Sequence, residues 1–460
     1  MLAAILLAAA SAAPARVSEL IVQQTVHIDA EFIPTAAHVR ELIAHDQWKE
    51  ALGEARSLIE DFKDPDAVTA LGEALYRAGL IDEAGEALQP VVAADDPPAR
   101  ALAQLGLVRA AQGKDAEALT LMERAVSKAP RDPWVVYHAS GATRTRAQAV
   151  GLLETYVETA PGDDPDRLEG ARGSIRLSRA LGERKVWNRV RTPAHLELPL
   201  KPLTGTGGGY FVEATLANRK KIRLLLDTGS TGLFVVLRAV KKGGLSLLSD
   251  ETVFAGGNTG RTPSSRGLLA TLSLGELEIE DALVTTTTDE FDPQGRIHGV
   301  LGLNVFDGYR VTLDFPRQKL ILSLPGDEFQ SSRYWDVGGQ MLVQASASAV
   351  HDGLFLFDTG AVRSMVGRSF ANSVPGAQVE HAADVRTYGG NVAGAASVRG
   401  VKLRLSGFTV DGGGPMFVSD LTQRSRLGGV EISGFVGMDL LDKSKIVIDT
   451  VRHVVAVEKN

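Results

Sequence analysis

Two segments of the chain share one unusual pattern, and this duplication limits the possible folds more than any other feature of the sequence. Residues 224–235, LLLDTGSTGLFV, carry an aspartate, a threonine and a glycine directly after a run of large apolar residues. Residues 354–366, LFLFDTGAVRSMV, repeat this order. A single Asp-Thr-Gly after a strand is explained by an ordinary turn, in which Asp caps backbone amides and Gly adopts a positive φ. Two copies indicate a repeated unit of structure.

The sequence that follows each copy also matches the other. A glycine-rich stretch typical of a hairpin tip comes first, FAGGN at 254–258 and TYGGN at 387–391. Next come HGVLGLNVF at 298–306 and SGFVGMDLL at 433–441, and each precedes a strand-like segment. Three ordered motifs therefore occur twice.

The spacing within the two copies is the same. The second glycine of the later motif precedes an aspartate at an identical interval in each copy, from Gly302 to Asp314 and from Gly437 to Asp449. The repeat therefore defines two lobes of roughly 120 to 130 residues. We place these lobes at 205–325 and 340–458.

The order of these motifs resembles that of the aspartic proteases, the pepsin-like and retropepsin-like enzymes, over residues 195–460. The resemblance implies an all-β, bilobal fold, hydrolysis of a peptide or protein substrate, and neither cofactor nor metal. Two carboxylates held close together cannot both ionise cheaply, so they share one proton over a wide pH range. One takes a proton from water while the other gives a proton to the substrate carbonyl. We expect Asp227 and Asp358 to be this catalytic pair, and the sequence does not assign the shared proton to either of them.

The residues next to the two aspartates are expected to hold them in place. The resemblance implies that the hydroxyls of Thr228 and Thr359 bridge the two loops and keep the carboxylates coplanar. Gly229 and Gly360 allow a sharp turn and a close approach of the two backbones. Simple β-turn chemistry is the alternative explanation for these residues.

The two loops differ at the residue after the glycine. Ser230 matches the pepsin-like pattern, in which this hydroxyl hydrogen-bonds the adjacent carboxylate, whereas Ala361 matches the retroviral pattern and has no hydroxyl. We therefore expect the two aspartates to be inequivalent. Three other aspartates are not followed by Thr-Gly and are predicted to be strand-end or loop carboxylates: Asp314, Asp439 and Asp449.

The glycine-rich stretches are candidates for flaps that close over a substrate. The candidate residues are Gly256 and Gly257 in the first lobe and Tyr388, Gly389 and Gly390 in the second. Tyr388 occupies the place where a pepsin-like flap often carries a tyrosine, but an aromatic residue beside a hairpin is equally well explained as part of the core. The sequence does not decide which hairpin closes over a substrate.

Residues 38–182 have the pattern of helices and contain an internal repeat. LGEALYRAGLIDEAGEAL (71–88) aligns with LGLVRAAQGKDAEALTLM (105–122), so that Leu71 matches Leu105 and Gly72 matches Gly106. This offset resembles the period of tetratricopeptide repeats, in which small residues let paired helices pack closely. The resemblance implies a concave surface for a protein partner or a substrate. A helical spacer or a cover for the lobes is the alternative.

Pro, Gly and basic residues at 183–209 predict a junction between the helices and the first lobe, with the linker at 183–204. We expect each lobe to have its own core, so that a chain beginning near Val190 folds without the helices. A glycine-rich run at 205–209 precedes a strand pattern and does not join a strand to a helix, which argues against nucleotide binding.

The first residues, MLAAILLAAASAAPAR, predict a signal peptide over 1–15 and export to the periplasm or the outside of the cell. The apolar run ends in small residues and is too short for a stable membrane span. No Lys or Arg precedes it, so the true start of the chain stays open. A net charge of -7 without a basic-aromatic stripe argues against nucleic acid as a partner. The nine histidines are scattered without metal-ligand spacing.

These features predict a multidomain protein with N-terminal all-α, tetratricopeptide-like repeats and a C-terminal all-β, bilobal aspartic protease fold. The predicted function is that of an aspartic endopeptidase. One alternative is a catalytically silent peptide-binding protein that retains the cleft. Another is a scaffold whose main function lies in the helical repeats.

Overall fold

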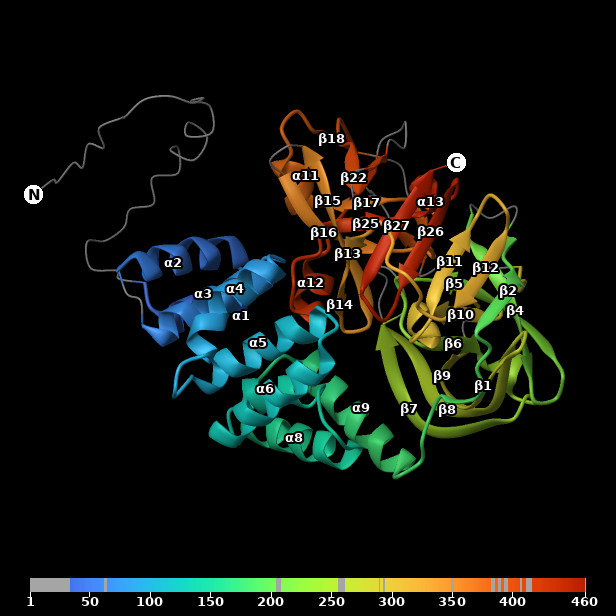
Figure 1. The fold of residues 1–460 in the computed structure, drawn as a ribbon, viewed down its shortest axis with the longest axis horizontal. Helices are drawn as coiled ribbons and strands as arrows, with labels where there is room; N and C mark the ends of the chain where they lie inside the picture. The colour runs from blue at the N-terminus through green and yellow to red at the C-terminus, as the bar shows by residue number, and fades with distance from the viewer. Residues whose placement is uncertain are drawn as a thin grey trace, which may run out of the picture.

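The computed structural model describes most of the chain from Pro34 onward. The described residues are 34–61, 64–203, 208–254, 261–288, 290–292, 294–348, 351–381, 385–387, 390–392, 396–405, 408–410 and 416–459. Helices make up the first part of this chain and strands dominate the second (Figure 1). The predicted order, an all-α region followed by a β-rich bilobal region, is therefore confirmed.

The helical region consists of antiparallel helices that follow one another along the chain. Their bounds are α1 (Ala36–Ala44), α2 (Trp48–Asp61), α3 (Pro65–Arg77), α4 (Ile81–Val92), α5 (Ala99–Ala111), α6 (Asp115–Lys128), α7 (Pro133–Ala139), α8 (Arg146–Thr159) and α9 (Pro165–Leu181). Helix α5 follows α3, and α6 follows α4, at the same offset that relates the two repeated segments of the sequence. The repeat seen in the sequence is thus a repeat of helix pairs.

Local sequence signals explain where several of these helices begin and how closely they pack. Helices α3, α7 and α9 each start with Pro after an Asp whose side chain accepts hydrogen bonds from the first free amides of the helix. A Cβ atom added to Gly72 of α3 would lie 2.5 Å from Leu88 Cγ of α4. At the equivalent place, a Cβ on Gly106 would lie 3.0 Å from Met122 Cε. Glycine at these positions therefore allows the paired helices to touch.

The β-rich region contains three large sheets among the described residues. A nine-stranded sheet, which we call lobe 1 from here on in place of the predicted range 205–325, has β1 (Asn188–Arg191), β3 (Lys201–Pro202), β4 (Tyr210–Leu216), β5 (Lys221–Asp227), β6 (Leu233–Val236), β7 (Leu245–Phe254), β8 (Arg261–Leu274), β9 (Leu277–Thr287) and β10 (Gly299–Gly302). The short helices α10 (Leu237–Val240) and η1 (Leu303–Phe306) belong to the same part of the chain.

A ten-stranded sheet, which we call lobe 2, repeats this arrangement later in the chain. It has β14 (Trp335–Val337), β15 (Gln340–Ser348), β16 (His351–Phe357), β17 (Met365–Gly367), β18 (Gln378–His381), β21 (Ala396–Arg399), β22 (Leu403–Leu405), β23 (Phe408–Val410), β24 (Met416–Ser419) and β25 (Gly434–Val436). Helices α11 (Arg368–Ser373), α12 (Thr422–Gly428) and α13 (Met438–Leu441) accompany it, and β19 (Val385–Thr387) and β20 (Gly390–Val392) form a separate hairpin.

A six-stranded sheet joins the two lobes. Its strands are β2 (His195–Pro199), β11 (Arg310–Asp314), β12 (Lys319–Ser323), β13 (Ser332–Arg333), β26 (Ser444–Asp449) and β27 (Val454–Lys459). At its centre β11 pairs antiparallel with β26, so the closing strands of the two lobes meet.

The two lobes have the same strand connections. In lobe 1, β5 is parallel to β10, β10 is antiparallel to β6, and β6 is parallel to β9. In lobe 2, β16 is parallel to β25, β25 is antiparallel to β17, and β17 is parallel to β24. The sequence repeat is therefore a structural repeat.

The segment 183–204 is not the linker that we predicted. It contains β1, β2 and β3, which pair with β9, β12 and β4 respectively. In β2 the side chains alternate between exposed and buried, with Leu196 and Leu198 inside the core. This alternation outweighs the Pro and basic residues that suggested a junction.

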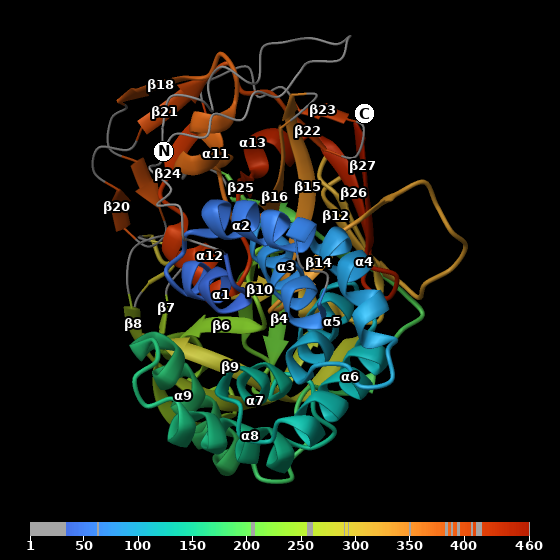
Figure 2. The same ribbon diagram turned by 90° about the vertical axis from the view of Figure 1, so that its left-hand side faces the viewer.

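The expectation that each lobe has its own core is also wrong, because one apolar cluster contains residues of both lobes and a second joins lobe 2 to the helices. One continuous apolar cluster contains residues of α3 and α5 together with Leu354, Leu356, Phe435 and other lobe 2 residues. Figures 1 and 2 show the helices lying against this lobe. Most residues of α3 and α5 are buried, as expected for helices that are covered on more than one side.

Polar contacts strengthen this interface. The buried guanidinium of Arg77, at the end of α3, forms ion pairs with Asp46 and with Glu431, whose own amide donates to the Arg77 carbonyl at 2.8 Å. Asp82 accepts hydrogen bonds from Arg333 and from the Trp335 indole at 3.2 and 3.4 Å. The helices and lobe 2 therefore form one unit.

No helix within the described residues combines the length and the apolar character that a membrane crossing requires.

A chain that begins at Glu183, after α9 and before β1, tests this interface. We expect it to aggregate, because removal of the helices exposes the apolar face that includes Leu354, Leu356 and Phe435. Size-exclusion chromatography and denaturant unfolding, with the full chain as control, provide the measurement. A soluble monomer that unfolds cooperatively at the same denaturant concentration as the full chain would contradict the shared core.

Candidate active site

The two predicted catalytic aspartates lie at equivalent ends of two strands. Asp227 ends β5, beside Gly302 of the parallel strand β10. Asp358 follows β16, and its amide donates to the carbonyl of Val436 in the parallel strand β25 at 3.0 Å. The loops that follow these two strand ends contact each other through Thr228 and Thr359.

Thr228 and Thr359 join the two aspartate loops through four reciprocal hydrogen bonds. Each threonine amide donates to the hydroxyl of the other at 3.1 Å. The Thr228 hydroxyl donates to the Phe357 carbonyl at 2.6 Å, and the Thr359 hydroxyl donates to the Leu226 carbonyl at 2.9 Å. Both threonines are buried, so these groups have no water to replace a lost partner. The structure thus contains the bridge that the resemblance implied.

Glycine is required where the two loops cross. A Cβ atom on Gly229 would lie 2.7 Å from Asp358 Cγ, and one on Gly360 would lie 2.5 Å from Asp227 Cγ. Real Cβ atoms do not approach other heavy atoms this closely. Each loop glycine therefore packs against the carboxyl group of the opposite lobe.

The carboxyl groups of Asp227 and Asp358 lie beside the opposite loop glycines and influence each other's pKa. Protein surrounds them on most sides, although both keep partial access to solvent. Burial raises the pKa of each carboxyl above its usual range, and the neighbouring Asp358 raises the pKa of Asp227 further. The pair therefore retains a proton at a pH where isolated aspartates have lost theirs.

The two carboxyls receive different numbers of backbone hydrogen bonds. Asp227 Oδ1 accepts from the Gly229 amide at 2.9 Å. Asp358 Oδ1 accepts from two amides, Gly360 at 2.9 Å and Ala361 at 2.8 Å. The expected inequivalence of the aspartates is present, but its source differs from the one we predicted.

The predicted hydrogen bond from the Ser230 hydroxyl to Asp227 is not among the bonds of the described residues. The Ser230 amide instead donates to the Asp227 carbonyl at 3.2 Å, and Ala361 makes the corresponding bond to Asp358 at 3.3 Å. Because the backbones of the two loops match, the sequence difference at this position leaves the turn unchanged.

The three aspartates predicted to be structural have structural contacts. Asp314 accepts from the amide and guanidinium of Arg317, and Asp449 accepts from the amides of Val451 and Arg452. Asp439 accepts from the amide and hydroxyl of Ser364 at 2.8 and 2.7 Å. None of these contacts involves the paired carboxyls.

The flap candidates lie almost entirely outside the described residues. This applies to Gly256, Gly257, Tyr388 and Gly389. Gly390 begins β20 and pairs with Thr387 of β19, so a hairpin is present at this place in lobe 2.

Two residues that sequence reasoning missed support or adjoin the site. Asn304 of η1 accepts a hydrogen bond from the Gly232 amide at 2.6 Å, which holds the loop after Asp227. Its counterpart in the repeat is Asp439, so the alignment of the two glycine motifs could have identified it. The second residue, Arg424 of α12, acts electrostatically on both catalytic candidates and has no sequence signal.

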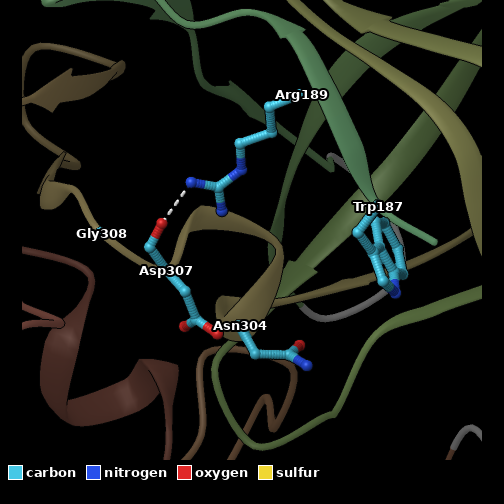
Figure 3. A pocket seen from close by; sticks show the side chains of 5 residues that line it. All are labelled: Trp187, Arg189, Asn304, Asp307 and Gly308. Carbon is cyan, nitrogen blue, oxygen red and sulfur yellow. Dashed lines mark hydrogen bonds between the residues drawn. The ribbon is translucent and has the colours of Figure 1, made fainter. Parts of the chain in front are cut away.

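A cavity of about 450 Å³ lies beside Asn304, the residue that holds the loop after Asp227. It is lined by Trp187, Arg189, Asn304, Asp307 and Gly308 (Figure 3). Arg189 spans one side and donates to the carbonyls of Asp307 and Val305. Burial, together with the nearby Asp336, raises the pKa of Asp307 to about 6. Within the described residues, no group of three or more His, Cys, Asp or Glu side chains could hold a metal ion.

Residues 212–305 match the family model of the aspartyl proteases. The chain therefore contains an aspartyl protease domain. The match includes the first Asp-Thr-Gly loop and the glycine motif of β10. No curated protein sequence matches the chain. Among solved structures, conglutin gamma, described as a unique basic 7S globulin from lupine seeds, is similar with a TM-score of 0.35 and 12% identity, over 58% of this chain and 96% of that chain.

The threonine bridge of the aspartyl protease domain predicts a specific loss of stability. Thr228→Val keeps the shape but leaves the Thr359 amide and the Phe357 carbonyl without partners, which we expect to lower the free energy of unfolding by about 1–3 kcal/mol for each group. Thr228→Ser keeps the hydroxyl and is the control. Equal denaturant stability of the two variants would argue against the bridge.

The crossing of the loops predicts that Gly360 tolerates no side chain. We expect Gly360→Ala to lower the free energy of unfolding by about 1–3 kcal/mol, because the added methyl group overlaps Asp227. Gly151 of α8 has open space where a Cβ atom would lie, so Gly151→Ala should be neutral or stabilising by up to about 1 kcal/mol. Equal effects of the two changes in denaturant unfolding would rule out the close approach.

Proposed function

We propose that the protein is an aspartic endopeptidase that hydrolyses peptide bonds between Asp227 and Asp358. The observation that carries the proposal is the crossing of the two aspartate loops, in which each loop glycine packs against the carboxyl group of the opposite lobe. Burial raises the pKa of both carboxyls, as a proton-sharing pair requires. The reciprocal threonine bridge supports it, because a pair held by backbone groups keeps its geometry through a reaction. The aspartyl protease match over residues 212–305 supports the same class of activity.

The proposed reaction uses the pair as one acid and one base. The ionised aspartate takes a proton from a water molecule while the water oxygen forms a bond to the peptide carbonyl carbon. The protonated aspartate gives its proton to the carbonyl oxygen, which produces a tetrahedral diol. When the C–N bond breaks, the nitrogen takes a proton from the aspartate that accepted one from water. The diol hydroxyl returns its proton to the other aspartate, which restores the singly protonated pair.

The proposal also covers substrate recruitment and location. A protein partner on the helical repeats would use the outer surfaces of α4 and α6, because α3 and α5 are largely buried against lobe 2.

Export to the periplasm or outside the cell rests on the composition of residues 1–15, which lie outside the described residues. Fractionation of cells that produce the protein, followed by N-terminal sequencing, tests that location.

Single replacement of either aspartate tests the activity. We expect Asp227→Asn and Asp358→Asn each to lower kcat at least about a hundredfold, because each removes a group that must exchange a proton. The measurement is cleavage of a diverse peptide library across acid and neutral pH, with and without a statine inhibitor. If Asp358→Asn cleaves as fast as wild type, the pair is not the catalyst. If wild type binds the library peptides without cleaving them, the silent peptide-binding protein is the better description.

The same replacement has an effect on stability that needs no substrate. The pKa of Asp227 in the folded protein lies above its value in the unfolded chain. At neutral pH the carboxyl is therefore ionised more easily in the unfolded chain than in the folded protein, and this difference lowers the free energy of unfolding. We therefore expect Asp227→Asn to be more stable than wild type at neutral pH, with the difference disappearing in acid.

Asp449 provides a control of opposite sign. Burial opposes its ionisation, but hydrogen bonds from Arg452 and Val451 outweigh burial and lower its pKa. Asp449→Asn should therefore lose stability at neutral pH. A loss of stability in Asp227→Asn under the same conditions would contradict the strained, proton-sharing pair.

A further inference from the structure

Arg424 is a buried cation that acts on the catalytic pair and has no ion-pair partner among the described residues. Its guanidinium carbon lies 4.9 Å from the centre of the Phe435 ring. Its Nε atom is buried and makes no hydrogen bond, and within the described residues the side chain forms no ion pair. Burial lowers the pKa of this arginine, and the carboxyls of Asp358 and Asp227 oppose that effect. The charge is therefore compensated by the two catalytic candidates and by the aromatic ring.

Helix α12 holds Arg424 in this place. The Ser425 hydroxyl accepts the Ile432 amide at 2.9 Å, and Arg426 forms an ion pair with Asp164 at the start of α9. Figures 1 and 2 show α12 between the helical region and the sheet of lobe 2. The backbone around Arg424 is thus fixed from both sides.

The position of Arg424 favours one aspartate over the other. Phe435, against which it stacks, precedes Val436, and the Val436 carbonyl accepts the Asp358 amide. Of the two carboxyls, Asp358 has the larger effect on the pKa of Arg424 and Asp227 the smaller, so the interaction with Asp358 is the stronger one. The two amides on Asp358, against one on Asp227, act in the same direction.

Lobe 1 has no equivalent of this cation among its described residues. The segment before β10 carries acidic residues instead, and these are paired with arginines of their own. Glu290 accepts from Arg238 at 2.7 Å, and Asp292 accepts from Arg296 at 3.0 Å. The segments that precede β10 and β25 therefore differ in their charged residues.

We propose that Arg424 is a positioning residue that makes Asp358 the ionised base and leaves the shared proton on Asp227. This inference rests on the proposed peptidase function and assigns the two roles within it. Asp358 takes the proton from water as the water oxygen bonds to the carbonyl carbon, and Asp227 gives its proton to the carbonyl oxygen. Arg424 exchanges no proton in this scheme and touches no reacting atom.

The pH profile of kcat/KM tests this assignment. The acid limb reports loss of the first proton of the pair, and the alkaline limb reports loss of the second. Removing the cation disfavours both ionisations, so Arg424→Gln should move both limbs to higher pH. We expect the acid limb to move by about 1 pH unit and the alkaline limb by less, because the first proton comes from Asp358, with which Arg424 interacts more strongly.

Two variants separate this effect from a structural one. Arg424→Lys keeps the charge and should restore the wild-type limbs. Arg399→Gln removes an arginine of β21 in the same lobe whose partner is Glu380, so it should leave the limbs in place. Unmoved limbs in Arg424→Gln, or a larger movement of the alkaline limb, would overturn the assignment. So would a change confined to KM for substrates with acidic side chains, since Arg424 would then be a substrate contact.

A second measurement keeps the inference testable if the protein shows no turnover, which would refute the proposed function alone. Arg424 stabilises Asp358 only when that carboxyl is ionised. The stability lost in Arg424→Gln should therefore grow as the pH rises through the titration of the pair, and this growth should vanish when Asp358 is also replaced by Asn. A loss that is independent of pH, or that persists unchanged without the Asp358 carboxyl, would overturn the inference.

Discussion

The four hydrogen bonds between Thr228 and Thr359 are the interaction on which the site depends. Each hydroxyl accepts the amide of the opposite loop and donates to the carbonyl before the opposite aspartate. These bonds are buried and mutual, so one lobe cannot shift without leaving polar groups of the other unsatisfied. The separation of Asp227 and Asp358 is therefore set by the two threonine hydroxyls and the backbone groups that they contact. The raised pKa of the pair follows from that enforced closeness and from burial.

The helices contribute to the same arrangement. They cover the face of lobe 2 that would otherwise be apolar surface, whereas on lobe 1 the helical region contacts strand β7 through α9. This difference makes two lobes of similar topology unequal in their surroundings. Helix α12 lies in the covered interface and carries both Arg426, which contacts the helical region, and Arg424, which acts on the pair. The packing of the helices thereby supports the cation that distinguishes the two aspartates.

The sequence predicted the features that depend on short, repeated patterns. The two Asp-Thr-Gly segments and the period of the helical repeat each specify local backbone geometry, and both reappear in the structure. Other features depend on contacts between distant segments. The strand at Leu196 and Leu198 carries only a short alternating pattern, which Pro and basic neighbours obscured. The position of Arg424 and the packing of Phe435 against the helices follow from tertiary structure, and no local pattern encodes them.

Neutron diffraction from a deuterated crystal, at a pH within the active range, tests the central claim most directly. The account predicts a single deuteron between the facing oxygens of Asp227 and Asp358. It also predicts that the Thr228 and Thr359 hydroxyl deuterons point to the carbonyls of the opposite loops. Two carboxylates without a deuteron between them, or two separately protonated carboxyls with the threonine hydroxyls turned elsewhere, would contradict it.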